Sequence, residues 1–416
     1  MTAAGSVLDG LEQVRPGQEE LYRDLHSHPE LSHQEHRTAA RVAELLRGSD
    51  RVQVHEGVGG TGVVGVLRNG DGPVVLLRAD MDALPVREAS GVPYASTATT
   101  SVDGTEIPVA HACGHDVHVA CLVGATTLLA QATDQWRGTL VALFQPAEET
   151  GDGARGMVDD HLVDLLPGVD VAFAQHVLPF PAGVVGTHPG PVLSAADSMR
   201  VTLHGRGGHG SMPQATVDPV VLAASIVVRL QTVVSREVAP TETAVLTVGS
   251  LQAGTKSNVI PEQAELQLNI RTYSEQTRQD MLDAVRRIVT AECRAADCPQ
   301  EPEFELSDRF PLTDNDTATT LRVAEAFGAF FGDRAREMGQ QTASEDFSDL
   351  PAALGVPYTY WGIGGIDPET YRRAEEAGRV SQDVPVNHSA TFAPVIQPTL
   401  DTGTRALVVA ALAWLG

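Results

Sequence analysis

Two kinds of apolar pattern divide the chain. In its first part, short β-branched apolar runs, typical of buried strands, alternate with longer amphipathic stretches, typical of helices. The predicted helices are 7–23, 38–46 and 116–131, and the predicted strands are 63–67, 74–77, 139–144 and 171–174. Strands that alternate with helices favour an α/β domain built on one sheet.

A different pattern begins near residue 195. Several segments there alternate apolar and polar residues with a period of two, which is typical of antiparallel strands with one covered face. Strands are predicted at 199–203, 243–251, 264–271 and 303–306, and helices at 217–236 and 275–296. The α/β pattern then returns, with a helix at 317–331, a strand at 357–363 and a helix at 400–414.

The sequence therefore predicts one domain interrupted by another. The expected fold class is α/β, with a mixed sheet and helices on both faces, formed by residues 1–194 and 306–416. Residues 195–305 are expected to form a smaller α+β domain with a four-stranded antiparallel sheet and two helices.

Two local patterns have specific interpretations. Ser32 and Glu35 stand three residues apart before the helix at 38–46, which is a capping-box signature for a helix start. Residues 57–62, Gly-Val-Gly-Gly-Thr-Gly, match the G-x-G-x-x-G pattern of dinucleotide sites. Such a site needs the turn to open a helix, whereas 63–67 is strand-like, so we interpret these residues as a Gly-rich turn before a strand.

Charge and apolar content narrow the class of protein. The 416 residues carry 29 Lys plus Arg and 54 Asp plus Glu, a formal net charge of −25. A surface of this sign repels nucleic acid and anionic membranes unless it carries a basic patch, and the sequence has no dense Lys/Arg cluster. The longest stretch without a charged residue, 171–196, contains four prolines, so neither a membrane span nor a membrane partner is expected. The N-terminal residues lack the basic and apolar regions of a signal peptide.

The cysteines do not form a recognisable framework. Cys113, Cys121, Cys293 and Cys298 contain no C-x-x-C pair, and four cysteines in a chain of 416 residues do not indicate a disulfide-stapled protein. The lack of a disulfide framework favours a reducing compartment, and we expect the protein to be cytoplasmic.

Side chains that ligate metals gather in a few short segments. Acidic or imidazole groups follow the predicted strands, a Cys and a His precede the helix at 116–131, and Asn-His-Ser lies near the C-terminus. The residues are Asp80, Asp82, Cys113, His115, Glu148, Glu149, His176 and His388. Because ligand sites of open α/β sheets form at the carboxyl ends of strands, we expect these residues to converge on one metal site.

The mixture of donors suits particular chemistry. Thiolate, imidazole and carboxylate together bind borderline ions such as Zn²⁺, Mn²⁺, Co²⁺ or Ni²⁺. The adjacent Glu148 and Glu149 are able to divide the work, with one as ligand and the other as general base; a solvated acidic pair at a helix start is the plain alternative. Cys113 as a nucleophile is a further alternative, but surrounding carboxylates would raise its pKa. The sequence contains neither G-x-S-x-G nor H-E-x-x-H.

The motifs resemble those of a known family. Arg78-Ala-Asp-Met-Asp-Ala-Leu-Pro85, His111-Ala-Cys-Gly-His-Asp116, Gln145-Pro-Ala-Glu-Glu149 and Asn387-His-Ser389 resemble the metal-dependent amidohydrolases related to aminoacylase and carboxypeptidase G. The hippurate hydrolases, N-acyl-amino-acid amidohydrolases and plant indole-acetyl-amino-acid hydrolases are the most similar branch. The resemblance covers nearly the whole chain. One departure is Arg78, which stands where more distant relatives have a ligand His.

The resemblance implies roles for the residues of the sheet domain. The ligands of two divalent ions, Zn²⁺ or Mn²⁺ with Co²⁺ or Ni²⁺ also suitable, would be Cys113, His115, Glu149, His176 and His388. Glu148 would be the general base that activates water and later protonates the leaving amine. Asp80 would lie behind the site and orient a ligand.

The resemblance also gives the inserted domain a role as lid and dimerisation domain. His209, in Gly205-Arg-Gly-Gly-His-Gly, would stabilise the oxyanion and typically reaches the partner's site. Asn258 and Arg271 would contact the substrate carboxylate. A homodimer through the lid is expected, or a tetramer.

The function implied is hydrolysis of the amide bond of N-acyl-L-amino acids, with an acetyl, benzoyl or aryl-acetyl group, by metal-activated water. A dipeptidase or carboxypeptidase on the same scaffold is the alternative. A binding protein that kept the fold would lack Glu148 or a ligand, and this sequence lacks neither. A purely structural acidic protein does not account for so many metal-binding motifs.

Overall fold

The computed structural model describes residues 3–102 and 104–416. The chain forms two compact units. The larger contains the residues up to Val192 together with 314–340 and 346–416, and the smaller contains Leu193–Thr313 and Gln341–Glu345. The predicted fold class, an α/β unit interrupted by a smaller α+β unit, is confirmed.

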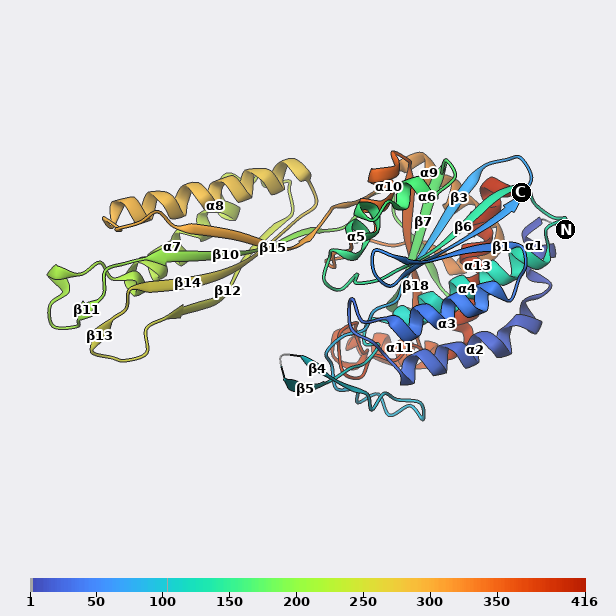
Figure 1. Ribbon diagram of the computed structural model, residues 1–416, viewed down its shortest axis with the longest axis horizontal. Helices are drawn as coiled ribbons and strands as arrows, with labels where there is room; N and C mark the ends of the chain where they lie inside the picture. Colours follow the sequence, from blue (N-terminus) through green and yellow to red (C-terminus); the bar gives the residue numbers. More distant parts are fainter. Residues whose placement is uncertain (1–2, 103) are drawn as a thin grey trace. The chain divides into compact units, whose positions relative to one another are not determined.

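The larger unit is built on an eight-stranded mixed sheet in the order β1-β2-β6-β3-β7-β18-β8-β17. Figure 1 labels β1, β3, β6, β7 and β18 of this sheet. Its strands are β1 (Val52–Val58), β2 (Gly62–Asn69), β3 (Val74–Asp80), β6 (Gly138–Gln145), β7 (Val171–Pro181), β8 (Val185–Thr187), β17 (Ala335–Glu337) and β18 (Tyr358–Ile366). The central strands β6, β3, β7 and β18 are parallel. Their carboxyl ends therefore point to one edge of the sheet.

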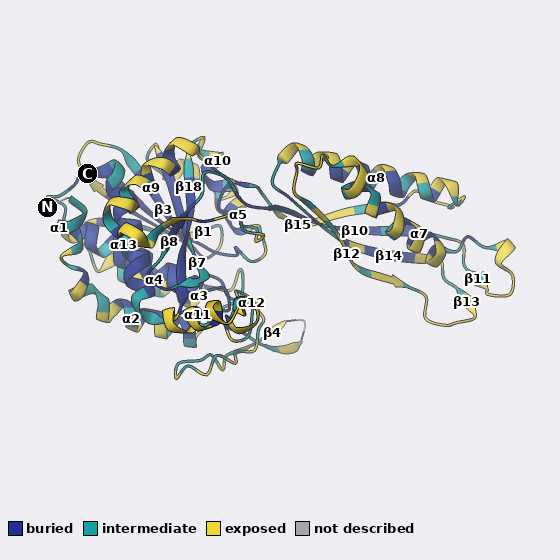
Figure 2. Ribbon diagram, turned by 180° about the vertical axis from the view of Figure 1, so that it is seen from behind, coloured by how far each residue is buried: buried dark blue, intermediate teal, exposed yellow. Residues whose placement is uncertain are grey.

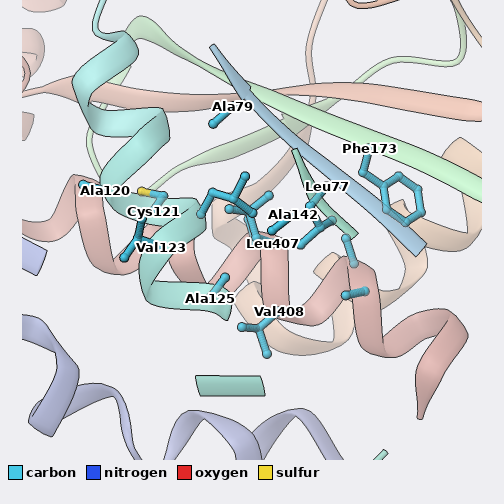
Figure 3. Close-up of a cluster of buried hydrophobic side chains, with 14 of the residues drawn as sticks. Leu77, Ala79, Ala120, Cys121, Val123, Ala125, Ala142, Phe173, Leu407 and Val408 are labelled. Atoms are coloured by element: carbon cyan, nitrogen blue, oxygen red, sulfur yellow. The ribbon is translucent and has the colours of Figure 1, made fainter. Parts of the chain in front are cut away.

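Helices bury the sheet. They are α1 (Ala3–Leu8), α2 (Leu11–Ser27), α3 (His36–Arg47), α4 (His115–Gln131), α5 (Gly153–Asp159), α6 (Leu162–Leu165), α9 (Thr317–Phe331), α10 (Asp349–Leu354), α11 (Pro368–Glu376), α12 (Val380–Asp383) and α13 (Ile396–Leu415). Figure 3 shows Leu77 and Phe173 of the strands, Cys121 of α4 and Leu407 of α13, which all belong to one buried cluster. Successive residues of β6 are buried on both sides of the strand, which explains its continuous apolar sequence.

Most predicted elements of this unit are present, and the Gly-rich residues 57–62 form the turn between β1 and β2, as interpreted. The capping box was wrong. Helix α3 begins at His36, two residues before the predicted start, and Glu30 accepts hydrogen bonds from the backbone N–H groups of Arg37 (2.9 Å) and Thr38 (2.8 Å). Ser32 instead donates to Asp82 at 2.7 Å, so an acidic residue upstream caps the helix and leaves Ser32 free for the site.

The smaller unit contains a four-stranded antiparallel sheet in the order β12-β14-β10-β15. Its elements are β10 (Ala195–His204), β11 (Gly208–His209), α7 (Pro219–Thr232), β12 (Ala244–Ala253), β13 (Val259–Ile260), β14 (Gln263–Thr272), α8 (Glu275–Ala295) and β15 (Glu303–Phe310). Alternate residues of β10 and β14 form a core with α7 and α8, whose outer faces are exposed (Figure 2). The period-two pattern thus has the predicted cause.

The short strands β9 (Gly190–Leu193) and β16 (Thr313–Asn315) pair with each other, as do β4 (Thr99–Val102) and β5 (Thr105–Pro108).

One helical stretch of this unit is unusually apolar. Residues Pro219–Glu237, which are α7 and the turn of π-helix after it, are long and apolar enough to cross a membrane by length and composition. A single such helix is weak evidence, because core helices pass the same test, and the inner face of α7 is part of the core. Its outer face exposes Val221 (62%) and Val228 (72%).

Candidate metal centre

The predicted ligands come from the loops and strands at one edge of the large sheet. Asp80 ends β3, and the loop after β6 carries Glu148 and Glu149. His176 does not end its strand as predicted, because β7 continues to Pro181. Pairing between β7 and β3 stops at Ala174, however, so His176 lies just beyond the last residue that β3 covers.

Gly114 shapes the loop that brings Cys113 and His115 to this edge. Its φ of 86° lies in the left-handed region, and a Cβ there would stand 2.4 Å from Val177 Cγ1. Only glycine satisfies both the backbone conformation and the close approach. Helix α4 begins directly afterwards with His115 at its first position.

A buried carboxylate holds the loop of Glu148. Ala147 adopts a left-handed φ of 52°, which is costly for a residue with a Cβ. Its backbone N–H donates to Glu35 Oε1 at 2.8 Å, and Thr61 Oγ1 donates to Glu35 Oε2 at 2.6 Å. These bonds fix the backbone next to Glu148, whose side chain is 7% exposed.

The donor atoms lie close enough to share ions. The residues that cluster within 4.8 Å include Cys113 with His115 and His176, Cys113 with Glu149 and His388, and His115 with Glu148 and Glu149. Cys113 Sγ is 3.4 Å from His176 Nε2, and His388 Nε2 is 3.4 Å from Glu149 Oε2. The structure thus brings together all five predicted ligands, and Cys113 belongs to two of the groups.

The residues fit metal ions. Within the described ranges 3–102 and 104–416, His115 Nε2 and Glu149 Oε1 are buried without a hydrogen-bond partner, 3.8 Å apart. Buried polar atoms without partners are costly, and a cation between them would satisfy both. The S, N and O donors together match the borderline divalent ions.

The protonation of the cluster is consistent with a cation site. Burial raises the pKa of the Cys113 thiol well above its usual value and that of Glu149 to about 7. Burial lowers the pKa of His176 and, with His115, that of His388, so both imidazoles are neutral as ligands require. Burial also acts to lower the pKa of His115, but Asp80 and the other acidic groups around it outweigh burial and raise that pKa well above its usual value. Binding of divalent ions would therefore release protons from Cys113, Glu149 and His115.

Asp80 and Asp82 have different partners. Asp82 Oδ1 is 3.2 Å from His115 Nδ1, and Asp82 Oδ2 accepts the backbone N–H of Glu149 at 2.9 Å. Asp80 hydrogen-bonds instead to His118 and to Arg78, both at 2.5 Å. Arg78 is buried as a cation against Asp80 and Asp346, so its side chain does not act as a metal ligand.

Asn387 joins the C-terminal candidate ligand, His388, to the rest of the cluster. Its side-chain amide donates to the backbone oxygens of Cys113 and Val177, both at 3.1 Å. The backbone N–H of the adjacent His388 donates to Ala112 O at 2.8 Å. These bonds fix a predicted ligand that lies more than 200 residues from the others in sequence.

The smaller unit holds the remaining predicted residues at two separate places. His209 on β11 is paired with Val259 on β13, and the backbone oxygen of Asn258 accepts a hydrogen bond from the backbone N–H of Gly210 at 2.9 Å. Arg271 lies at the opposite end of the sheet, where β14 pairs with the first residues of β10. The length of β10 separates these ends by roughly 25 Å.

Sequence reasoning missed several residues that support the ligands. Glu35, His118 and Asn387 all stand in or beside the quoted patterns, but their hydrogen bonds join segments far apart in the chain. The one available signal for His118 was its spacing of three from His115, which places both on one face of a helix.

Comparison with protein-family models identifies the family of the chain. The model for peptidase family M20/M25/M40 matches residues 76–383, which include four of the five predicted ligands and Glu148. The chain belongs to peptidase family M20/M25/M40. It is a metal-dependent hydrolase of this family, in agreement with the resemblance seen in its motifs.

Individual M20 relatives carry two kinds of name. N-acetylcysteine deacetylase of Bacillus subtilis is 36% identical over 83% of this chain and 88% of its own length. Thermostable carboxypeptidase 2 of Saccharolobus solfataricus is 38% identical over 90% of this chain and 89% of its own. A crystal structure from Bacillus subtilis, described as a dinuclear metal-binding M20 peptidase, superposes with a TM-score of 0.77 and 27% identity, covering 96% and 98% of the two chains.

A buried ion pair behind the site predicts a pH dependence of stability. His26 lies between Asp116 Oδ2 at 2.6 Å and Glu88 Oε1 at 3.0 Å. Burial lowers the pKa of His26, but the two carboxylates outweigh it and raise the value from 6.5 to about 10. The rings of Tyr22 and Tyr94 also face His26, and burial raises their pKa values above 10.

The folded protein therefore keeps a proton that the unfolded chain releases. We expect the free energy of unfolding, measured with urea in a chelator, to fall between pH 6.5 and about 10. The decrease contributed by His26 would be at most about 1.4 kcal/mol per pH unit. The variant His26→Gln should show a flatter profile across this window; a slope equal to that of the wild type would contradict the assignment.

Proposed function

We propose that this protein hydrolyses the amide bond of N-acyl-L-amino acids with an acetyl, benzoyl or aryl-acetyl group, using two divalent ions. The observation that carries the proposal is the pair of donor groups that share Cys113, with Glu148 beside them. Relatives named deacetylase, hippurate hydrolase and N-acyl-L-amino acid amidohydrolase support the substrate class.

In the proposed reaction, Cys113, His115, Glu149, His176 and His388 hold the ions. When bound, Zn²⁺ or Mn²⁺ (or Co²⁺ or Ni²⁺) would acidify water and polarise the amide carbonyl. Glu148 accepts the proton of the attacking water and transfers it to the leaving amine. Its buried carboxylate, with Oε2 3.8 Å from His115 Nε2, lies where such a proton would be released.

The smaller unit would supply groups that recognise the substrate. His209 Nδ1 lies 3.1 Å from the backbone N–H of Ser211, which donates to it. A neutral His209 therefore carries its proton on Nε2, which is then free to donate to an oxyanion. The guanidinium of Arg271 donates hydrogen bonds to Asn269 and to Thr342 O and offers a cation for the substrate carboxylate. Asn258 would contact the same carboxylate.

The separation of these groups favours a homodimer. His209 and Asn258 are roughly 25 Å from Arg271 along the sheet, farther than a small substrate extends. One active site that uses all three would need a second copy of the chain. The exposed apolar face of α7 and the edge strand β12 offer surfaces for this dimer or a tetramer. We place the enzyme in the cytoplasm, since its four cysteines are free thiols.

Replacing His209 by alanine tests the oxyanion role. We expect kcat to fall by about 10²–10³-fold, the usual cost of losing one oxyanion donor, with a small change in KM. The measurement is steady-state hydrolysis of one N-acyl substrate. His188→Ala, a half-buried histidine of the larger unit outside the donor cluster, serves as the control. An unchanged kcat in His209→Ala would contradict the role.

A substrate panel tests the proposed function against a carboxypeptidase or dipeptidase. Free amino acid released from N-acetyl-, N-benzoyl- and indole-acetyl-amino acids would be compared with release from dipeptides that have a free amino terminus. We expect release from the acylated substrates. The relatives named carboxypeptidase support the alternative function, cleavage of peptides. Release from dipeptides alone would support it and overturn the proposal.

A further inference from the structure

His118 is a buried histidine that is outside the predicted ligand set. It lies on α4 three residues after His115 and is 1% exposed. Its Nδ1 is 2.5 Å from Asp80 Oδ1, and the backbone N–H of Val177 donates to its Nε2 at 2.8 Å. Since a backbone N–H only donates, Nε2 is an acceptor, and the proton on Nδ1 points to Asp80. The ring is therefore a fixed tautomer that joins a carboxylate to a backbone amide.

The backbone that His118 holds also holds a predicted ligand. His176 Nδ1 is 2.8 Å from the carbonyl oxygen of Val177, and it donates its proton there. This bond turns His176 Nε2 toward Cys113 Sγ, 3.4 Å away. Val177 is thus held at its N–H by His118 and at its carbonyl by His176 and Asn387.

The two acidic residues of β3 and its loop therefore serve different ligands. Asp82 Oδ1 lies within hydrogen-bond distance of His115 Nδ1, with no residue between them. Asp80 lies 3.8 Å from His115 Nε2, too far for a hydrogen bond, and its bonds go to Arg78 and His118. A continuous series of hydrogen bonds runs from Arg78 through Asp80, His118 and Val177 to His176.

We propose that His118 is a positioning residue that transmits the fixed geometry of Asp80 to His176 and so sets the affinity of one of the two ions. This inference rests on the proposed function, because it takes His176 as a metal ligand. Neighbours that orient a ligand typically change metal affinity by about 10–100-fold when they are lost.

Two substitutions separate the two bonds of His118. In His118→Gln the side-chain oxygen is able to reach the position of Nε2 and to accept the N–H of Val177. In His118→Asn the shorter amide is able to donate to Asp80 but does not reach Val177. The readouts are the dissociation constants of Co²⁺, measured by competition with a chelator, and the visible spectrum of the Co²⁺ protein.

We expect His118→Asn to bind one of two Co²⁺ ions about 10–100-fold more weakly and to show an altered spectrum, with His118→Gln closer to the wild type. Leu122→Ala, a fully buried apolar residue of the same helix, is the control and should lower Tm while keeping both affinities. If His118→Asn lowers Tm but binds both ions as the wild type does, His118 is merely structural and the inference is wrong. If the wild type itself binds no Co²⁺, the proposed function fails first.

Discussion

The variant Glu148→Gln is expected to lose turnover by about 10²–10⁴-fold and to keep its metal ions. Glutamine has the shape of glutamate but does not accept a proton at neutral pH, so water would no longer be deprotonated by the protein. Glu148 is placed for this role by the strained Ala147, whose N–H is held by Glu35. The measurement is kcat on an N-acyl substrate, with bound metal determined on the same sample.

The neighbouring carboxylate provides a matched control. Glu149 faces His388 at 3.4 Å and has a buried oxygen without a partner among the described residues 3–102 and 104–416, as a ligand would. Glu149→Gln should therefore lose metal, whereas Glu148→Gln should not. Turnover that survives in Glu148→Gln, or a Glu149→Gln protein that binds both ions as tightly as the wild type, would reverse the assignment of the two residues.

Replacing Cys113 by alanine is expected to weaken both ions at once. Cys113 contributes its sulfur to two of the donor groups, one with His115 and His176 and one with Glu149 and His388. Loss of a shared ligand should cost more than the 10–100-fold typical of a hydrogen-bonding neighbour. Metal content after dialysis against a defined free Zn²⁺ concentration measures the effect.

A second cysteine of the same helix tests whether the effect is specific. Cys121 is fully buried in α4 among apolar side chains, as Figure 3 shows. Cys121→Ala removes a thiol of equal size that no donor group contains, and it should retain both ions. Equal metal loss in the two variants would indicate a general effect of destabilising α4 and would contradict a ligand role for Cys113.

Local patterns predicted the elements well where burial and periodicity agree. The helix at 317–331 coincides with α9, and the helix at 275–296 coincides with α8 to within one residue. The short strands β8 and β17, the last two on one side of the sheet, were not predicted, because each has three residues and joins the sheet through its backbone. Their sequences carry no apolar repeat of their own.

The candidate ligands were easier to predict than the residues that would orient them. Residue type beside strands and a helix start placed Cys113, Glu149 and His176 in one expected cluster, which the structure contains, and the family resemblance singled them out as ligands. The roles of Asp80 and Asp82 depend on which of two acidic groups, two residues apart, meets His115, and only the tertiary structure decides this. Likewise, Ser32 was predicted to cap a helix because its competing partner, Asp82, lies 50 residues away.

The central claim is that two divalent ions in the Cys113 cluster are required for hydrolysis of N-acyl amino acids. The most direct measurement removes metal with a chelator, adds back Zn²⁺ or Mn²⁺ stepwise, and follows both bound ions per chain and amino acid released. The account predicts no release from the metal-free protein and recovery that is complete at two ions per chain. Full release from folded, metal-free protein, or saturation without binding at Cys113, would contradict it.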